Sequence, residues 1–340
     1  MDPINTPSPN VSLSVLDLVP VLSGKTVSDA FSSSLDLARH TEKLGYKRFW
    51  LAEHHNMPGI ASSATSVLIG YIAGGTQTIR VGSGGVMLPN HAPLVVAEQF
   101  GTLANLYPGR IDLGLGRAPG TDQLTAMALR RHLDPGAENF PQNVQELMRY
   151  MSKDNEGSKV RAVQAEGTEI PVWLLGSSSY SAQLAAILGL PFSFASHFAP
   201  NMLFSSLKLY RDTFQPSEFL AAPHTMAVIN VIAAETDEEA QYLATSLYQS
   251  FLNVIKGRAL PMLPPVDNMD ELWNSSEMYA VNQMLTYTFI GSAATVESKI
   301  RQFAEDTGVD EIMIACSIYD HQARLRSYEI VAGFSLQKSS

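Results

Sequence analysis

The sequence predicts an α/β protein built as a single (β/α)8 TIM barrel that spans residues 1–340. Short apolar runs typical of strands alternate eight times with helical patterns along the chain. Such alternation predicts parallel strands joined by crossover helices. No charge run or low-complexity linker divides the chain, so one closed barrel fits the length better than two doubly wound domains.

Eight segments have the apolar pattern of strands. The first, VSLSVLDL, alternates apolar and polar residues, as expected of a strand with one buried face. The later ones are more continuously apolar, which suits strands that are covered on both faces. The predicted strands lie within residues 11–18, 47–55, 79–84, 110–115, 169–179, 191–198, 224–236 and 311–318.

Helical patterns fill the intervals between these strands. Thr26 or Ser28 can cap the first helix, and Gly45 can end it. The helix expected at residues 237–255 carries Asp and Glu in its first turn, which suits the helix dipole. The remaining helices are expected near residues 62–73, 93–106, 136–151, 180–188, 201–211 and 294–306, with a last one from about residue 322.

Two segments fall outside this alternation. Residues 1–10 combine prolines with small polar side chains and predict a loose N-terminal leader rather than a signal peptide. Residues 256–287 are rich in proline and in polar side chains. We interpret them as an insertion between strands seven and eight.

Composition excludes several classes of function. The net charge of −10, without a basic stripe, argues against nucleic acid as a partner. No apolar run is long enough to cross a membrane, and the cytoplasm is the expected location. Cys316 is the only cysteine and lies in the apolar run EIMIACSI. We therefore expect neither a disulfide nor an all-cysteine metal cluster, and we expect Cys316 to be a buried, inert thiol.

Catalytic residues of such barrels lie at the carboxyl ends of the strands. Strands three and four end in the glycine-rich sequences GSGGVMLP and GLGRAPG, and Arg117 belongs to the second. Strand five ends in GSSSYS, at residues 176–181, which presents backbone N–H groups and hydroxyls to an anion. Together these features predict a phosphate-binding site. The alternatives are an ordinary serine N-cap and a surface ion pair for Arg117.

Histidines end strands two and six. His54 and His55 are neighbours whose side chains should diverge, so they cannot readily share a metal ion, and no metal site is expected. A histidine at the barrel mouth suits proton transfer near neutral pH, whereas the alternative is a histidine hydrogen-bonded within the core. His197 has the same two interpretations, and His91 is a candidate for lining the pocket. The remaining histidines, expected to be structural or solvated, are His40, His132, His224 and His321.

Four longer motifs carry a resemblance to a known family. They are FWLAEHHN, GGVMLPNHAP, LYPGRIDLGLGRAPGTD and GSSSYSAQLAAILGLP, in this order. With them the chain resembles, over nearly its whole length, the bacterial luciferase-like family of flavin-dependent monooxygenases. The resemblance implies a (β/α)8 barrel that binds FMN at the carboxyl ends of its strands, and it implies a homodimer.

The resemblance also implies roles for particular residues. Gly84 and Gly85 match the place where the family carries a non-prolyl cis peptide beneath the flavin ring. His54 matches the histidine linked to catalysis, as proton donor or acceptor, and Asn56 and His197 line the isoalloxazine pocket. The residues expected to hold the FMN phosphate are Arg117, Gly176, Ser177, Ser178 and Ser181.

The function implied is that of a two-component FMN-dependent monooxygenase. A separate flavin reductase would supply reduced FMN, and the protein would use O2 to oxygenate a small organic substrate. Gly116 stands where luciferase has a reactive cysteine, and Ser177 stands where luciferase has an acidic residue, so light emission is not expected. Two alternatives stay open: a deazaflavin-dependent oxidoreductase that transfers hydride, and a flavin-binding protein without turnover.

Overall fold

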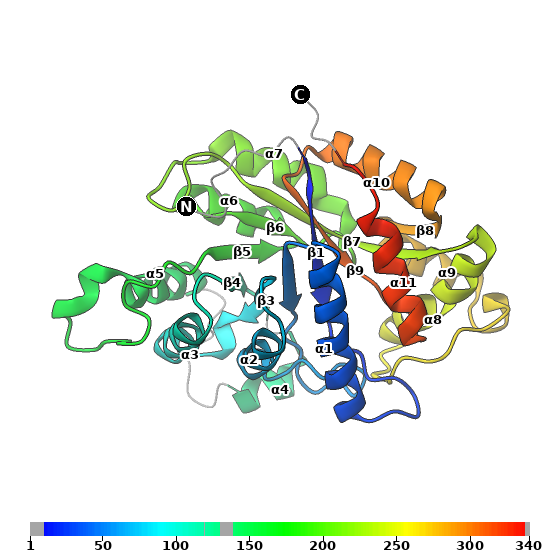
Figure 1. Ribbon diagram of the computed structural model, residues 1–340, viewed down its shortest axis with the longest axis horizontal. Coiled ribbons are helices and arrows are strands. Elements are labelled where there is room, and N and C mark those ends of the chain that lie inside the picture. The colour runs from blue at the N-terminus through cyan, green and yellow to red at the C-terminus, as the bar shows by residue number, and fades with distance from the viewer. Residues whose placement is uncertain (1–9, 119, 130–138, 337–340) are drawn as a thin grey trace.

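Eight parallel strands close into a barrel in the computed structural model, which describes residues 10–118, 120–129 and 139–336 (Figure 1). Strands neighbouring in sequence pair from the first to the seventh, and the ring closes because the last barrel strand pairs with both the seventh and the first. The predicted (β/α)8 fold is therefore confirmed. The barrel strands are β1 (Ser12–Asp17), β2 (Arg48–Leu51), β3 (Arg80–Met87), β4 (Ile111–Gly116), β5 (Val172–Gly176), β6 (Phe192–Phe194), β7 (Thr225–Ala234) and β9 (Glu311–Ala315).

A ninth strand, β8 (Thr288–Ser292), was missed by the sequence analysis. Residues 225–230 of β7 pair with β6 or β9 in the barrel, whereas residues 231–234 extend beyond it, and residues 230–234 pair with β8. The segment 256–287 contains the helix α9 (Ser275–Met284) and leads directly into this strand. The predicted insertion is thus partly helical, and it ends at an added strand rather than at a helix.

Helices lie outside the barrel and return the chain from the end of one strand to the start of the next (Figure 1). Thr26 is the N-cap of the first helix, where its side chain accepts the N–H of Asp29 and the Asp29 side chain accepts the N–H of Thr26. Gly45 takes a left-handed backbone conformation, with φ of 81°, just past the end of that helix. The helices around the barrel are α1 (Val27–Lys43), α2 (Thr65–Gly75), α3 (Pro93–Leu106), α5 (Phe140–Met151), α6 (Ser179–Leu188), α7 (Leu203–Thr213), α8 (Asp237–Ile255), α10 (Ala293–Thr307) and α11 (His321–Ala332).

A few predictions about elements were wrong or fall outside the described residues. The short helix α4 (Gln123–Leu129) was expected to be irregular. His132, most of the leader at 1–10 and the start of the helix predicted from residue 136 are outside the described residues. Within the described part of the chain, no helix is both long enough and apolar enough to cross a membrane.

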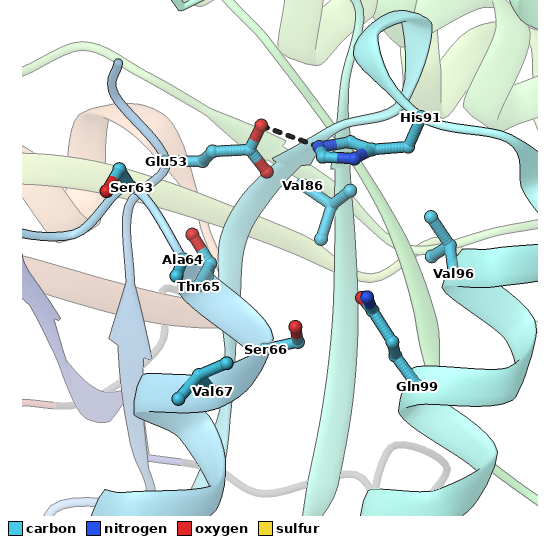
Figure 2. A pocket seen from close by; sticks show the side chains of 10 residues that line it. All are labelled: Glu53, Ser63, Ala64, Thr65, Ser66, Val67, Val86, His91, Val96 and Gln99. Carbon is cyan, nitrogen blue, oxygen red and sulfur yellow. Dashed lines mark hydrogen bonds and ion pairs between the residues drawn. The ribbon is translucent and has the colours of Figure 1, made fainter. Parts of the chain in front are cut away.

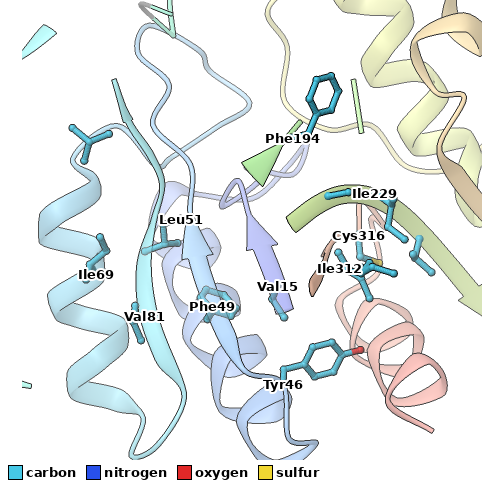
Figure 3. Packing of buried hydrophobic residues seen from close by; sticks show 14 of the residues in the cluster. Val15, Tyr46, Phe49, Leu51, Ile69, Val81, Phe194, Ile229, Ile312 and Cys316 are labelled. Carbon is cyan, nitrogen blue, oxygen red and sulfur yellow. The ribbon is translucent and has the colours of Figure 1, made fainter. Parts of the chain in front are cut away.

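The main apolar core fills the space between the barrel and the helices. Phe49, Leu51 and Ile69 belong to this core, as do Ile229 and Ile312 (Figure 3). Cys316 belongs to the same core and is 3% exposed. Burial raises the pKa of its thiol to about 11, so the thiolate is not formed near neutral pH. The expectation of a buried, inert cysteine is confirmed.

A buried network of charges closes the amino-terminal end of the barrel. Arg48 begins β2 and is fully buried; its Nη1 lies 2.7 Å from Asp112 Oδ2, and its Nε lies 3.0 Å from Glu311 Oε1. Above the guanidinium, Trp173 packs with its ring centroid 4.9 Å from Arg48 Cζ, and Trp50 meets Trp173 edge to face. Since these side chains fill the amino-terminal end of the barrel interior, the carboxyl end of the strands is left for a ligand.

Candidate functional site

The backbone of β3 and β4 forms a tightly packed surface at the carboxyl end of the barrel. The peptide bond between Gly84 and Gly85 is cis, as the family resemblance implied. A Cβ atom at Gly84 would lie 2.7 Å from Leu16 Cδ1, and one at Gly85 would lie 2.8 Å from the carbonyl oxygen of Gly114. A side chain at either position would clash with these neighbours, so backbone atoms form this part of the site.

Arg117 lies directly after β4 and is held by an aromatic ring of α6. Its Cζ lies 4.1 Å from the ring centroid of Tyr180, the second residue of that helix. Cation–π contacts of this kind stabilise a pair by about 0.5–2 kcal/mol. Within the described residues Arg117 forms no ion pair with a carboxylate, so the surface ion pair considered from the sequence is not observed. The guanidinium donors are therefore free to bind an anion.

The N-terminus of α6 is open to the same side. Ser178 is the N-cap residue with an extended backbone, but its side chain accepts no hydrogen bond from the helix. The first N–H groups of a helix lack partners within the helix and carry a partial positive charge. Tyr180 lies in the first turn of α6 and contacts Arg117. The cationic guanidinium therefore lies at the same helix end as the free backbone N–H groups.

Ser177 and Ser181 complete the arrangement. Ser181 is buried in the first turn of α6, and Gly176 ends β5 next to it. A Cβ atom at Gly176 would lie 2.5 Å from Ser181 Oγ, so the glycine makes room for the hydroxyl. Gly176, Ser177, Ser178 and Ser181 thus lie together around the start of α6, and Arg117 reaches this helix through its contact with Tyr180. A guanidinium, helix N–H groups and hydroxyls form a donor set that fits a phosphate group.

His54 and His197 lie after β2 and β6, and each has a buried Nδ1 atom without a hydrogen-bond partner among the described residues. Burial lowers the pKa of His54, although the Gly120 carbonyl and the Glu53 charge partly oppose this. Burial, with a smaller contribution from nearby His54, lowers the pKa of His197 to about 3. Both imidazoles are therefore neutral near pH 7. Their unpaired nitrogens are available to a ligand.

Asn56 lies at the rim rather than in the interior. It is exposed, has a left-handed backbone with φ of 54°, and donates from Nδ2 to Asp122 Oδ2 at 3.2 Å. The Thr121 hydroxyl donates to the carbonyl of His55 at 3.0 Å. These bonds join the loop after β2 to the loop after β4. The role of Asn56 in lining a flavin pocket stays a prediction.

The expectation that the second strand continues to His55 was wrong, because β2 ends at Leu51. Beyond Leu51, side chains form hydrogen bonds with the backbone: the Thr65 hydroxyl donates to the Ala52 carbonyl, and the Glu53 carboxylate accepts the N–H of Met87. Glu53 also contacts His91, as Figure 2 shows. Glu53 was among the candidates expected at the carboxyl end of the second strand, but its contact with His91 was not predicted, since nothing in the spacing connects it to a histidine 38 positions away.

The other histidines lie outside this site. His40 pairs with Glu329, and His321 pairs with Asp36. His224 lies 4.0 Å from both Asp310 and Glu311 at the amino-terminal end of the barrel. These positions confirm the structural or solvated character that was expected for the three.

Comparison with known proteins gives close matches over almost the whole chain. Residues 12–311 match the family described as luciferase-like monooxygenase. A protein of Escherichia coli strain K12 named luciferase-like monooxygenase is 56% identical and covers 94% of this chain and 96% of its own length. In Bacillus subtilis strain 168, a protein named N-acetyl-S-alkylcysteine monooxygenase is 33% identical and covers 95% of this chain and 97% of its own.

Solved structures show the same fold. The crystal structure of apo-MsnO8 superposes with a TM-score of 0.85 at 34% identity, covering 95% of this chain and 97% of its own. The oxygenating component of a diketocamphane monooxygenase from Pseudomonas putida, in complex with FMN, has a TM-score of 0.72 at 17% identity and coverages of 95% and 97%. An F420-dependent secondary alcohol dehydrogenase has a TM-score of 0.69 at 14% identity and coverages of 94% and 97%.

Proposed function

The chain belongs to the luciferase-like monooxygenase family, and from this premise we propose that it is a two-component FMN-dependent monooxygenase. A separate flavin reductase supplies reduced FMN, and the protein uses O2 to oxygenate a small organic substrate in the cytoplasm without emitting light. The observation that carries the choice of FMN is Arg117, stacked on Tyr180 beside the open N-terminus of α6. This donor set suits the phosphate of a mononucleotide.

Other residues of the chain would orient the ring and exclude water. Gly84 and Gly85 carry no side chains, and a planar ring system would rest against their backbone. Reduced FMN supplies the two electrons needed to place one oxygen atom of O2 in the substrate and to release the other as water. His197, neutral and partly buried, lines the pocket with its free Nδ1.

We assign proton transfer to His54. Its Nδ1 is the ring nitrogen left without a partner among the described residues, and burial keeps the imidazole neutral. A neutral imidazole at the barrel mouth accepts a proton at Nδ1 and returns it later, as general acid–base catalysis requires. Nearby His197 has too low a pKa to hold a proton near pH 7, so His54 is the stronger candidate of the two.

Two other functions are considered: deazaflavin-dependent hydride transfer, and flavin binding without turnover. A deazaflavin-dependent oxidoreductase shares the fold, but at 14% identity, whereas the relative named as a monooxygenase is 33% identical. This difference favours oxygenation. Anaerobic titration with reduced FMN and with a reduced deazaflavin separates these two functions by affinity. Oxygen uptake with a panel of aldehydes, ketones, thioethers and aromatics separates a monooxygenase from a flavin-binding protein without turnover, for which tight binding without uptake is expected.

Replacement of Arg117 by alanine is expected to weaken the binding of reduced FMN by about 1.5–3 kcal/mol, the contribution of a hydrogen bond to a charged group. The corresponding dissociation constant rises by roughly 10-fold to 150-fold. Isothermal titration under anaerobic conditions measures the change.

Arg149→Ala is the matched control for this prediction. Arg149 also packs on a tyrosine, with its Cζ 5.8 Å from the ring centroid of Tyr150, but it lies in the last turn of α5. Its removal should leave FMN affinity unchanged. Equal affinities of wild type and Arg117→Ala would remove Arg117 from the site.

We also propose that the protein is a homodimer. Helices α2 and α3 contact one another, and both are rich in apolar residues. Together they expose four large apolar side chains to solvent: Val67, Tyr71, Val95 and Leu106. A second copy of the chain that covers this surface would remove it from water. Light scattering coupled to size-exclusion chromatography should give twice the mass of one chain, and Val67→Glu/Tyr71→Glu should give one chain. A monomeric wild type would contradict the proposal.

A further inference from the structure

Three potential metal ligands converge beside the loop that carries His54. Glu53 Oε1 lies 2.9 Å from His55 Nε2 and 2.8 Å from His91 Nε2, and the three ligand atoms all lie within 4.8 Å of one another. We propose that Glu53, His55 and His91 bind one divalent transition-metal ion. Two imidazoles and one carboxylate are a ligand set that suits Zn²⁺ foremost.

The chain path explains why these side chains meet. Since β2 ends at Leu51, Glu53 and His55 lie in the loop after it, two positions apart. His91 comes directly after the 3-10 turn Leu88–Asn90 that ends β3. Figure 2 shows Glu53 and His91 pointing toward one another from these two segments. His54 lies between Glu53 and His55 in sequence, but it is not one of the three converging ligands.

The carboxylate is buried and oriented. Glu53 is 2% exposed, and its Oε2 accepts the N–H of Met87 at 3.2 Å, which fixes the plane of the group and leaves Oε1 for the histidines.

The two distances between the carboxylate and the imidazoles require little adjustment. In tetrahedral zinc sites the ligands lie about 2.0–2.1 Å from the ion and therefore roughly 3.3 Å from each other. Each histidine would have to move away from Glu53 Oε1 by about half an ångström from the hydrogen-bonded spacing observed. Both histidines are partly exposed, so their rings have room to make this shift.

A cavity of about 180 Å³ adjoins the cluster and is lined by Glu53 and His91 (Figure 2). Ser63, Ser66 and Gln99 also line it, so its wall carries hydroxyl and amide groups. A water molecule occupies about 30 Å³ in the liquid, and the cavity can therefore hold the waters that complete a coordination sphere. It also gives an ion access to Glu53 and His91.

The same contacts are compatible with a hydrogen-bonded ion pair that holds no metal. In that case at least one Nε2 atom carries a proton, which it donates to Glu53 Oε1. Metal binding instead requires lone pairs on both Nε2 atoms, so protons and the ion compete.

The test uses the full-length chain without flavin, stripped by a chelator and dialysed. Calorimetric titration with Zn²⁺ should give one site per chain, and Co²⁺ should show the visible absorption bands of a site with nitrogen and oxygen ligands. His91→Ala and Glu53→Gln should each lower the affinity at least 10-fold. Circular dichroism checks that both variants are folded, and His91→Gln replaces His91→Ala if the latter is not.

The matched control is His321→Ala, because His321 Nε2 also lies 2.9 Å from a carboxylate oxygen, that of Asp36, but no third ligand is near in the described residues. This variant should keep the affinity of the wild type. The proposal is overturned if the wild type binds neither ion stoichiometrically, or if binding survives in folded His91 variants, or if it is lost in His321→Ala.

Discussion

His54→Gln is expected to lower the turnover number of substrate oxygenation by about 10²-fold to 10⁴-fold, the usual contribution of a general acid–base residue. Glutamine keeps a polar side chain of similar size but cannot accept and return a proton. Affinity for reduced FMN should stay close to that of the wild type, because His54 is not part of the phosphate-binding set. The measurement is steady-state product formation with a flavin reductase and a substrate that supports oxygen uptake.

The control for this prediction is His40→Gln, since His40 lies on α1 and pairs with Glu329 outside the site. The pH profile gives an independent check. The pKa of His54 is lowered by burial, so its neutral form persists below the ordinary value near 6.5, and the acid limb of kcat/KM should lie below that value. Unchanged turnover in His54→Gln, or an acid limb that persists in it, would remove His54 from the reaction.

Arg48→Met is expected to lower the free energy of unfolding by about 3–5 kcal/mol, the usual loss when one partner of a buried ion pair is removed. The fully buried guanidinium balances Asp112 and Glu311 at the amino-terminal end of the barrel interior. Arg80 also pairs with Asp112, and Lys47 pairs with Glu311, so some compensation remains and the lower end of this range is expected. Urea unfolding followed by tryptophan fluorescence measures the change.

Two comparisons sharpen this stability prediction. Arg301 pairs with Glu297 on the exposed side of α10, and Arg301→Met should change the stability by less than about 1 kcal/mol. The double variant Arg48→Met/Glu311→Gln removes one charge of each sign. It should therefore be more stable than Arg48→Met alone, although less stable than the wild type. An Arg48→Met protein as stable as the wild type would show that the network contributes no net stabilisation.

The sequence predicted the barrel and the phosphate site for one shared reason. Each barrel strand is an apolar run that is recognisable locally, and parallel strands place their carboxyl ends together. Arg117 and the residues 176–181 could therefore be assigned to one site although some 60 positions separate them in the chain. The stacking of Arg117 on Tyr180 was not predicted, because it depends on the rotamers of two side chains from neighbouring units.

Features that depend on pairing at long range were missed. Thr288, Phe289 and Ile290 are typical strand residues. However, β8 pairs only with the C-terminal half of β7, and no local sequence pattern predicts that β7 continues past the barrel. Glu53 and His91 meet because two loops approach one another above β2 and β3. His54 and His55 were expected to diverge and not to share a metal ion, and the two rings do differ in their partners: His55 pairs with Glu53, whereas Nδ1 of His54 has no partner among the described residues.

The central claim is that the barrel binds reduced FMN and controls its reaction with oxygen. Stopped-flow mixing of reduced FMN with oxygenated buffer, in the presence and absence of the protein, tests this most directly. We expect the flavin to reoxidise with a different time course when it is bound, and we expect Arg117→Ala to restore the time course of free flavin at concentrations where its weakened site is empty. Identical time courses with and without the wild-type protein, at flavin concentrations that saturate its proposed site, would contradict the account.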